Sequence, residues 1–248
     1  WFILHVIAKE FGLGAQDGFQ FNISVGYDLA GIKGDKVNTF IDGMMEAKDT
    51  VIFQECRKWL LDNADKFQNF TREDIEAIPS NVCNSATIST LHGCPPQEIE
   101  SIANYLLTEK HLNTFVKCNP TLLGYDFARK TMDEMGYDYM VFGDFHFKDD
   151  LQYEDAIPMF KRLQALADEL NLAFGVKITN TFPVDVTRNE LPSEEMYMSG
   201  KSLFPLSISL AARLSREFDG KLRIAYSGGA DYYRHYDRYA VCPAGDGL

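Results

Sequence analysis

The stretch Thr114-Phe-Val-Lys-Cys-Asn-Pro-Thr121 decides the fold of this chain, and a related stretch, Phe174-Gly-Val-Lys-Ile-Thr-Asn-Thr181, follows sixty positions later. In both, aromatic and β-branched residues lead to a lysine, and polar residues or proline come next. This pattern is typical of a buried strand that ends in a loop. Because α/β proteins place their chemistry where parallel strands end, we expect Lys117 and Lys177 to lie at a functional edge.

Segments with strand character alternate with segments of helical spacing along the chain. Such alternation favours a parallel sheet with crossover helices. The two lysine-tipped segments bring the predicted strands to six, whereas a closed barrel of this type has eight. The other predicted strands are residues 19–25, 86–91, 137–142 and 221–230. Helices are predicted over residues 1–11, 37–48, 52–67, 97–110, 126–135, 156–170 and 206–218.

Two further segments stand apart from this alternation. Residues 50–80 are predicted to form a helical insertion outside the core, with a capping box at residues 71–74. Residues 182–200 are predicted to form a long loop, because they contain two prolines and several acidic residues. Loops of this length inside a compact domain are usually functional or disordered.

The composition argues against several classes of partner. With 46% hydrophobic residues the chain can fill a core, and its net charge of −12 argues against nucleic acid or an anionic membrane as partner. No apolar run approaches the ~20 residues of a membrane span. The five cysteines form no CxxC pair, which favours reduced thiols in the cytoplasm and no cysteine-built metal site.

Lysines and glycines at the ends of strands are candidates for anion binding. A buried ammonium is costly without a partner, so Lys117 and Lys177 are expected to meet an anion, a cofactor or a substrate, unless they reach solvent at the rim. The pair Gly228 and Gly229 after Ser227 lets backbone N–H groups approach a phosphate. A plain strand-ending turn is the alternative for these glycines.

The segment His92-Gly-Cys94-Pro-Pro lies where catalytic loops are expected. A cysteine before a helix can act as an acid–base group or nucleophile, and the alternative is a buried thiol in a proline-stiffened turn. The histidines lack metal-binding spacing, so no metal site is predicted. Asp144, Asp149 and Asp150 are interpreted as a solvated face.

With these residues laid out, the order of motifs resembles the flavin-binding barrel of dihydroorotate and dihydropyrimidine dehydrogenases. Residues 116–120 are similar to the family's Val/Ala-Lys-x-x-Pro strand, whose lysine approaches the polar edge of the FMN ring. Residues 179–181 are similar to its Thr-Asn-Thr, which lines flavin and substrate. Residues 198–200 and 227–229 are placed like its two phosphate-holding turns. The resemblance implies FMN contacts at Lys117, Asn119, Lys177, Asn180, Thr181, Ser199, Gly200, Ser227, Gly228 and Gly229, and a proton-moving role for Cys94 or His92.

Longer runs resemble the selenate reductase flavoprotein subunits, which are multidomain relatives. These runs are residues 89–96, 115–125, 191–200 and 226–230, and the resemblance covers residues 19–230. It implies electron-transfer domains or subunits with FAD, iron–sulfur clusters and NAD(P)H outside this chain. The small-molecule substrate is then a heterocycle or a selenium oxyanion.

The expected fold is therefore an incomplete (β/α)8 TIM barrel of the dihydroorotate dehydrogenase type, without its first strands and its last strand. Residues 1–230 form the partial FMN barrel. Residues 231–248 form a polar, divergent tail, for which a shifted reading frame or a chance gene end is one hypothesis. The family's asparagine before its Ser-Cys-Pro is missing, so Cys94 matches either a structural or the catalytic cysteine. Which of Lys117 and Lys177 meets the flavin is also open.

Three functions follow from these features. The first is a flavin-dependent oxidoreductase domain, and the second is a catalytically inert barrel fragment or assembly module. The third is a lyase in which Lys117 or Lys177 forms a Schiff base with a carbonyl substrate.

Overall fold

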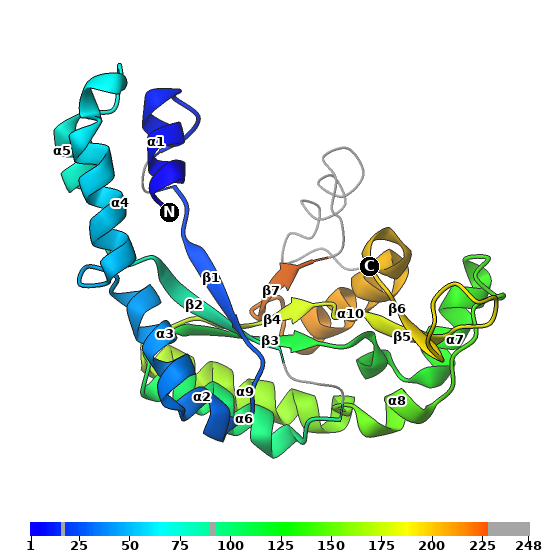
Figure 1. Cartoon of the computed structure of the whole chain (residues 1–248). Helices are drawn as coiled ribbons and strands as arrows, with labels where there is room; N and C mark the ends of the chain where they lie inside the picture. The colour runs from blue at the N-terminus through cyan, green and yellow to red at the C-terminus, as the bar shows by residue number, and fades with distance from the viewer. Residues whose placement is uncertain (16–17, 90–92, 228–248) are drawn as a thin grey trace. The chain divides into compact units, whose positions relative to one another are not determined.

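The computed structural model describes residues 1–15, 18–89 and 93–227 (Figure 1). The chain divides into two compact units. The first contains residues 1–24 and 30–86, and the second contains residues 25–29 and the chain from Thr87 onward. The tail predicted from residue 231, and the pair Gly228 and Gly229, lie outside the described residues.

The first unit is mainly helical. Its apolar side chains enclose a small core of its own, which buries Ala47, Phe53, Leu60, Phe70, Ile75, Ile78 and Val82. Helices α4 and α5 lie in the stretch where a helical insertion is expected. The elements that belong wholly or mostly to this unit are α1 (Phe2–Glu10), β1 (Phe21–Val25), α2 (Leu29–Lys33), α3 (Asp35–Met45), α4 (Val51–Asp62), η1 (Ala64–Lys66), α5 (Arg72–Glu76) and β2 (Cys83–Ile88).

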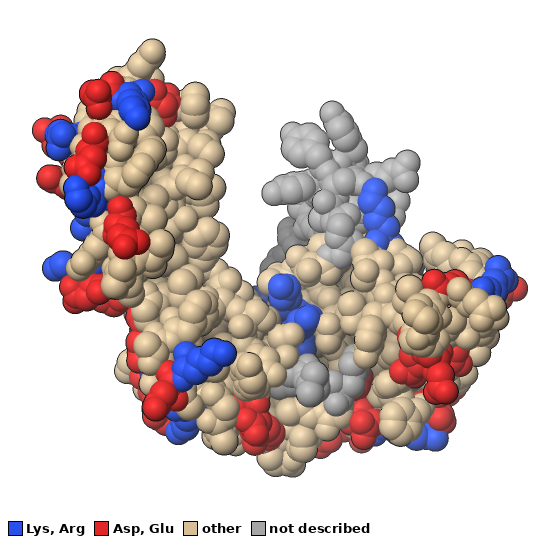
Figure 2. Space-filling model, viewed as in Figure 1, with Lys and Arg blue, Asp and Glu red and all other residues tan. Residues whose placement is uncertain are grey.

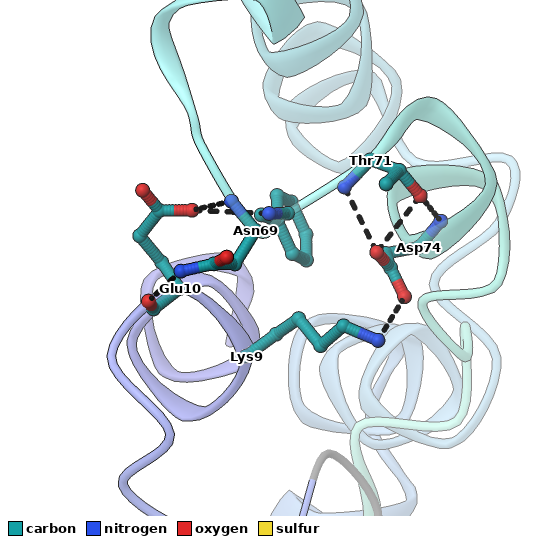
Figure 3. Close-up of polar contacts among 6 residues, drawn as sticks. Lys9, Glu10, Asn69, Thr71 and Asp74 are labelled. Carbon is teal, nitrogen blue, oxygen red and sulfur yellow. Dashed lines mark hydrogen bonds and ion pairs between the residues drawn. The ribbon is translucent and has the colours of Figure 1, made fainter.

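Polar contacts fasten the end of α1 to the start of α5 (Figure 3). The predicted capping box is confirmed, because Thr71 and Asp74 each accept a backbone hydrogen bond from the other residue. Lys9 forms an ion pair with Asp74 at 3.2 Å. The Glu10 carboxylate accepts the backbone N–H groups of residues 68–70 at 2.8–3.1 Å, and these donors, with Gln68 first, lower the pKa of Glu10.

The second unit is built on parallel strands. In this unit the strands of the sheet follow the order β3-β4-β7. Within the second unit, β3 (Asn113–Cys118), β4 (Phe174–Ile178) and β7 (Arg223–Tyr226) run parallel. The α/β fold with a parallel sheet is confirmed, and the strands of the described residues do not close into a barrel.

Helices connect these strands in the manner of crossovers. Helices α6 and α9 pack on β3 and β4 and against each other along one face of the strands (Figure 1). Their buried faces supply much of the core, including Leu106 and Phe160. The helices and short 3-10 turns of this unit are α6 (Pro96–Thr108), η2 (Pro120–Leu123), α7 (Tyr125–Glu134), α8 (Phe145–Asp149), α9 (Tyr153–Glu169), η3 (Gly200–Leu203) and α10 (Phe204–Glu217).

The centre of β4 requires a glycine. A Cβ atom at Gly175 would lie 2.5 Å from the carbonyl oxygen of Arg223 and 2.6 Å from the Phe115 ring. Both neighbours belong to the strands that flank β4. Because Gly175 has no side chain, the Phe115 ring can pack directly against the backbone of β4.

Two sequence predictions in this unit are wrong. Residues 137–142 form no strand; Tyr139 and Val141 are exposed, while Phe142 packs against Tyr125, Phe147 and Phe182. Of the aromatic residues that suggested a strand, Phe142 therefore joins an aromatic cluster instead. The predicted loop at residues 182–200 contains a hairpin of β5 (Phe182–Asp185) and β6 (Glu195–Met198). In addition, β2 begins three residues before the predicted strand at residues 86–91.

The surface agrees with the composition. On the face shown in Figure 2, acidic and basic side chains of the described residues are interspersed and gather into no broad basic patch. None of the described helices combines the length and the apolar character that crossing a membrane demands.

Candidate functional site

Lys117 and Lys177 lie side by side on neighbouring strands. They are register partners of the parallel pair β3 and β4, so both side chains project from the same face of the sheet at the same height. On β3 the alternate residues Val116 and Cys118 are buried on the opposite face. Both lysines are half-buried, and neither forms an ion pair within the described residues.

The Lys117 ammonium is held by a neighbour that the sequence did not indicate. Its Nζ donates to the Ser89 hydroxyl oxygen at 3.1 Å. Burial, and secondly the positive charge of Lys177, lower the pKa of Lys117. A lysine with a lowered pKa beside a second cation suits either stabilisation of negative charge or nucleophilic attack.

The segment that follows β4 meets the end of β3, and the segment that follows β7 meets the end of β4. The backbone N–H of Asn180 donates to the carbonyl oxygen of Cys118 at 2.8 Å, and that of Ser227 donates to Ile178 at 2.7 Å. Thr179 is buried, and its hydroxyl shares a hydrogen bond of 2.8 Å with Ser207. Asn180 and Ser227 therefore lie at the carboxyl edge of the sheet where Lys117 also lies.

The hairpin returns Ser199 to this edge. Phe182 and Met198 are register partners in the antiparallel pair β5 and β6, so Thr181 and Ser199 flank the pair at the base of the hairpin. Gly200 has a φ of 71°, which a glycine adopts without strain. An exposed Ser199, this glycine and the start of η3 thus follow one another directly.

Cys94 lies in the same region, in the turn before α6. It lies two residues before Pro96, the first residue of that helix, and is half-buried. Cys94, Lys117, Asn119 and Asp150 line one small pocket. The structure thus brings Cys94 and Lys117 together as predicted candidates, whereas His92 lies outside the described residues.

Asp150 contradicts the interpretation of a solvated acidic face. Asp144 and Asp149 are exposed, but only 4% of the surface of Asp150 is accessible. Its carboxylate accepts hydrogen bonds from Asn119 Nδ2 at 2.9 Å and from the Thr121 hydroxyl at 2.7 Å. The sequence prediction missed this residue because its partners lie about thirty positions away.

No cluster of three or more histidine, cysteine or acidic side chains suited to a metal occurs in the described part of the chain. The donor set at the edge consists instead of two ammonium groups, amides, hydroxyls and backbone N–H groups.

Comparison with known proteins identifies the family. The family model described as "Oxidoreductase YgfK, N-terminal TIM-barrel domain" matches residues 1–241. YgfK of Escherichia coli strain K12, a candidate oxidoreductase by name, is 48% identical over 242 residues, and so is YgfK of Escherichia coli O157:H7. Each alignment covers 93% of this chain and 23% of the relative, so the chain spans less than a quarter of the length of these proteins. No solved structure matches.

Proposed function

Because the chain belongs to the family of the YgfK oxidoreductase N-terminal TIM-barrel domain, we propose that it is the flavin-binding domain of a larger oxidoreductase. The cofactor is FMN, held at the carboxyl edge of β3, β4 and β7. One observation carries this proposal: Lys117 and Lys177 form an in-register pair of cations at the edge where Asn180 and Ser227 also lie.

The residues at this edge fit such a cofactor in their chemistry. A flavin has an anionic phosphate and a ring edge rich in carbonyl oxygens, which gains negative charge on reduction. Two half-buried ammonium groups that lack an ion pair within the described residues suit that charge. The Asn180 and Thr181 side chains add neutral polar groups beside them.

Each residue then has a separate task. Lys117 or Lys177 stabilises negative charge at the ring edge, because a fixed cation in a poorly solvated site acts strongly there. The turns at Ser199 and Gly200, and at Ser227, Gly228 and Gly229, hold the phosphate. Asn119 and Thr181 line the ring, and Asn180 orients the substrate. When bound, FMN supplies hydride transfer, and Cys94 or His92 moves the accompanying proton.

The remaining polypeptide of the parent protein supplies the partners. We place FAD, iron–sulfur clusters and the NAD(P)H site in those other domains. The substrate is a small heterocycle or a selenium oxyanion. A cytoplasmic location agrees with the free thiols of Cys56, Cys83, Cys94 and Cys118. A barrel domain at residues 1–230 and a divergent tail at 231–248 belong to the same proposal.

A Schiff-base lyase is the second candidate, favoured by the lowered pKa of Lys117. Burial and the neighbouring charge of Lys177 increase the fraction of neutral amine, which is the nucleophile in such enzymes. An inert fragment is the other candidate, in which the parent binds flavin and this chain alone does not.

Visible spectra of the purified parent and of this chain, compared side by side, test the proposal. We expect a yellow flavin band in both, and we expect it to weaken in Lys117→Met but not in Lys58→Met, which alters an exposed lysine on α4. A band in the parent alone supports the inert fragment. A colourless parent that is trapped covalently with a carbonyl compound by borohydride supports the lyase.

A further inference from the structure

We propose that Asp150 is a positioning residue that holds Asn119 and the turn before Cys94 in one fixed arrangement. The inference rests on the proposed function, because Asn119 and Cys94 belong to the flavin site described above. The Asp150 side chain contacts two segments that are distant from it in sequence, the loop after β3 and the turn before α6. None of the sequence motifs includes it.

The carboxylate of Asp150 joins parts of the site that are distant in sequence. One oxygen, Oδ2, accepts from Asn119 Nδ2 at 2.9 Å and from the Thr121 hydroxyl at 2.7 Å. The other, Oδ1, accepts the backbone N–H of Gly93 at 3.1 Å. The loop after β3 and the turn before α6 are thus fastened to the same buried group.

The conformation of Gly93 and its close approach to Asp149 both require a glycine at this position. Its φ is 77°, a conformation that side chains rarely adopt, and a Cβ atom there would collide with the Asp149 carboxylate. The turn therefore lies directly against residues 149 and 150. Cys94 follows in the next position, so its place depends on this attachment.

An ionised carboxylate fixes orientations that an amide would not. It only accepts hydrogen bonds, so Asn119 has to present its NH2 group, and not its oxygen, to Asp150. The Thr121 hydroxyl has to donate in the same way. An asparagine at position 150 would tolerate either orientation of the Asn119 amide, and the arrangement would no longer be unique.

Asp150 also lines the pocket that contains Cys94, Lys117 and Asn119. A buried carboxylate is costly unless it is well supplied with donors, and here Gly93, Asn119 and Thr121 all donate to it. These donors account for a buried acidic residue next to the exposed Asp149.

Two measurements on the full-length parent protein test the inference. The first is the alkylation rate of Cys94 without added flavin, followed by mass spectrometry. Asp150→Asn is expected to raise this rate several-fold, because the turn loses its anchor. The matched control is Asp144→Asn. Asp144 is exposed and lies at the start of α8, whereas Asp150 lies at its end, and this substitution is expected to leave the rate unchanged.

The second measurement is the dissociation constant of FMN. Asp150→Asn is expected to weaken binding about 10- to 100-fold, the range for losing hydrogen bonds to a charged group. This effect should shrink in an Asn119→Ala background, because Asp150 acts through Asn119. A merely structural role would leave the effect the same in both backgrounds.

The outcomes separate this inference from the proposed function. A parent that binds no FMN ends the proposed function, while Cys94 reactivity still decides the role of Asp150. Equal Cys94 rates in Asp150→Asn and wild type overturn the inference, even if FMN binds. Should Asp150→Asn fail to fold, Thr121→Val removes one donor with little change of shape, and the same two readouts are expected to move in the same direction by less.

Discussion

Replacing Phe182 with alanine tests whether the hairpin is anchored by the aromatic cluster. The Phe182 side chain is fully buried, and its ring centroid lies 4.8 Å from that of Phe142 and 5.7 Å from that of Phe147. Phe182 is also the first residue of β5, where the hairpin leaves the site. Its removal therefore affects both stability and the base that holds Ser199.

The expected loss of stability is large. Removing a buried phenylalanine ring costs about 3–5 kcal/mol, which includes the cavity left behind. Folded domains are stable by only about 5–15 kcal/mol, so the loss is a substantial part of the total. For a chain of this size each kcal/mol lowers the melting temperature by about 2–4 °C, which gives a decrease of roughly 6–20 °C.

Thermal unfolding followed by circular dichroism measures this decrease. Phe145→Ala is the matched control, because this nearby phenylalanine is 68% exposed and its removal should change stability by less than about 0.5 kcal/mol. Equal melting temperatures for the two variants would refute the reasoning. If the proposed function holds, Phe182→Ala should also weaken FMN binding, because the turn at Ser199 moves with the hairpin.

Three further predictions concern the sheet, the lysine pair and the first unit. Gly175→Ala should destabilise the protein by about 1–3 kcal/mol, because the new methyl group meets Arg223 and Phe115, and denaturant unfolding should detect this loss. Lys177→Met should raise the pKa of Lys117, and NMR titration can follow this change. Because the pKa of Lys117 is lowered in the folded state, the stability of the wild-type protein should rise as the pH increases toward 10.5. This rise should be smaller in the variant. The lowered pKa of Glu10 stabilises the wild-type protein above pH 4.5, and this stabilisation is lost as the pH falls. Glu10→Gln should remove this contribution. The melting temperatures of the two proteins should therefore converge at low pH.

The sequence predicted the elements that local pattern determines. The two lysine-tipped strands are recognisable because their β-branched and aromatic residues precede polar punctuation. The capping box at Thr71 and Asp74 depends on residues three apart, so its contacts are local. The helix that begins at Pro96 was also predicted, because proline favours the first turn of a helix.

Features with distant partners were not predictable in the same way. The aromatic residues at 137–142 have the composition of a strand, yet Phe142 packs against Phe182, forty positions away. Asp150 lies in an acidic segment, and only the folded chain brings Asn119 and Gly93 to it. Ser89 meets Lys117 across 28 positions. In each case the tertiary contact determines the role, and residue type alone suggests a different one.

The register of β3 and β4 also changes the question that the sequence left open, namely which lysine meets the flavin. A shift of one residue would have turned one lysine to the opposite face of the sheet, because side chains alternate along a strand. Instead Lys117 and Lys177 face the same side at the same height, and the charge of Lys177 contributes to the lowered pKa of Lys117. A substitution of Lys177 therefore changes the chemistry of Lys117 as well. A ligand that meets Lys117 experiences the field of Lys177 as well, so single substitutions should be non-additive with the double variant.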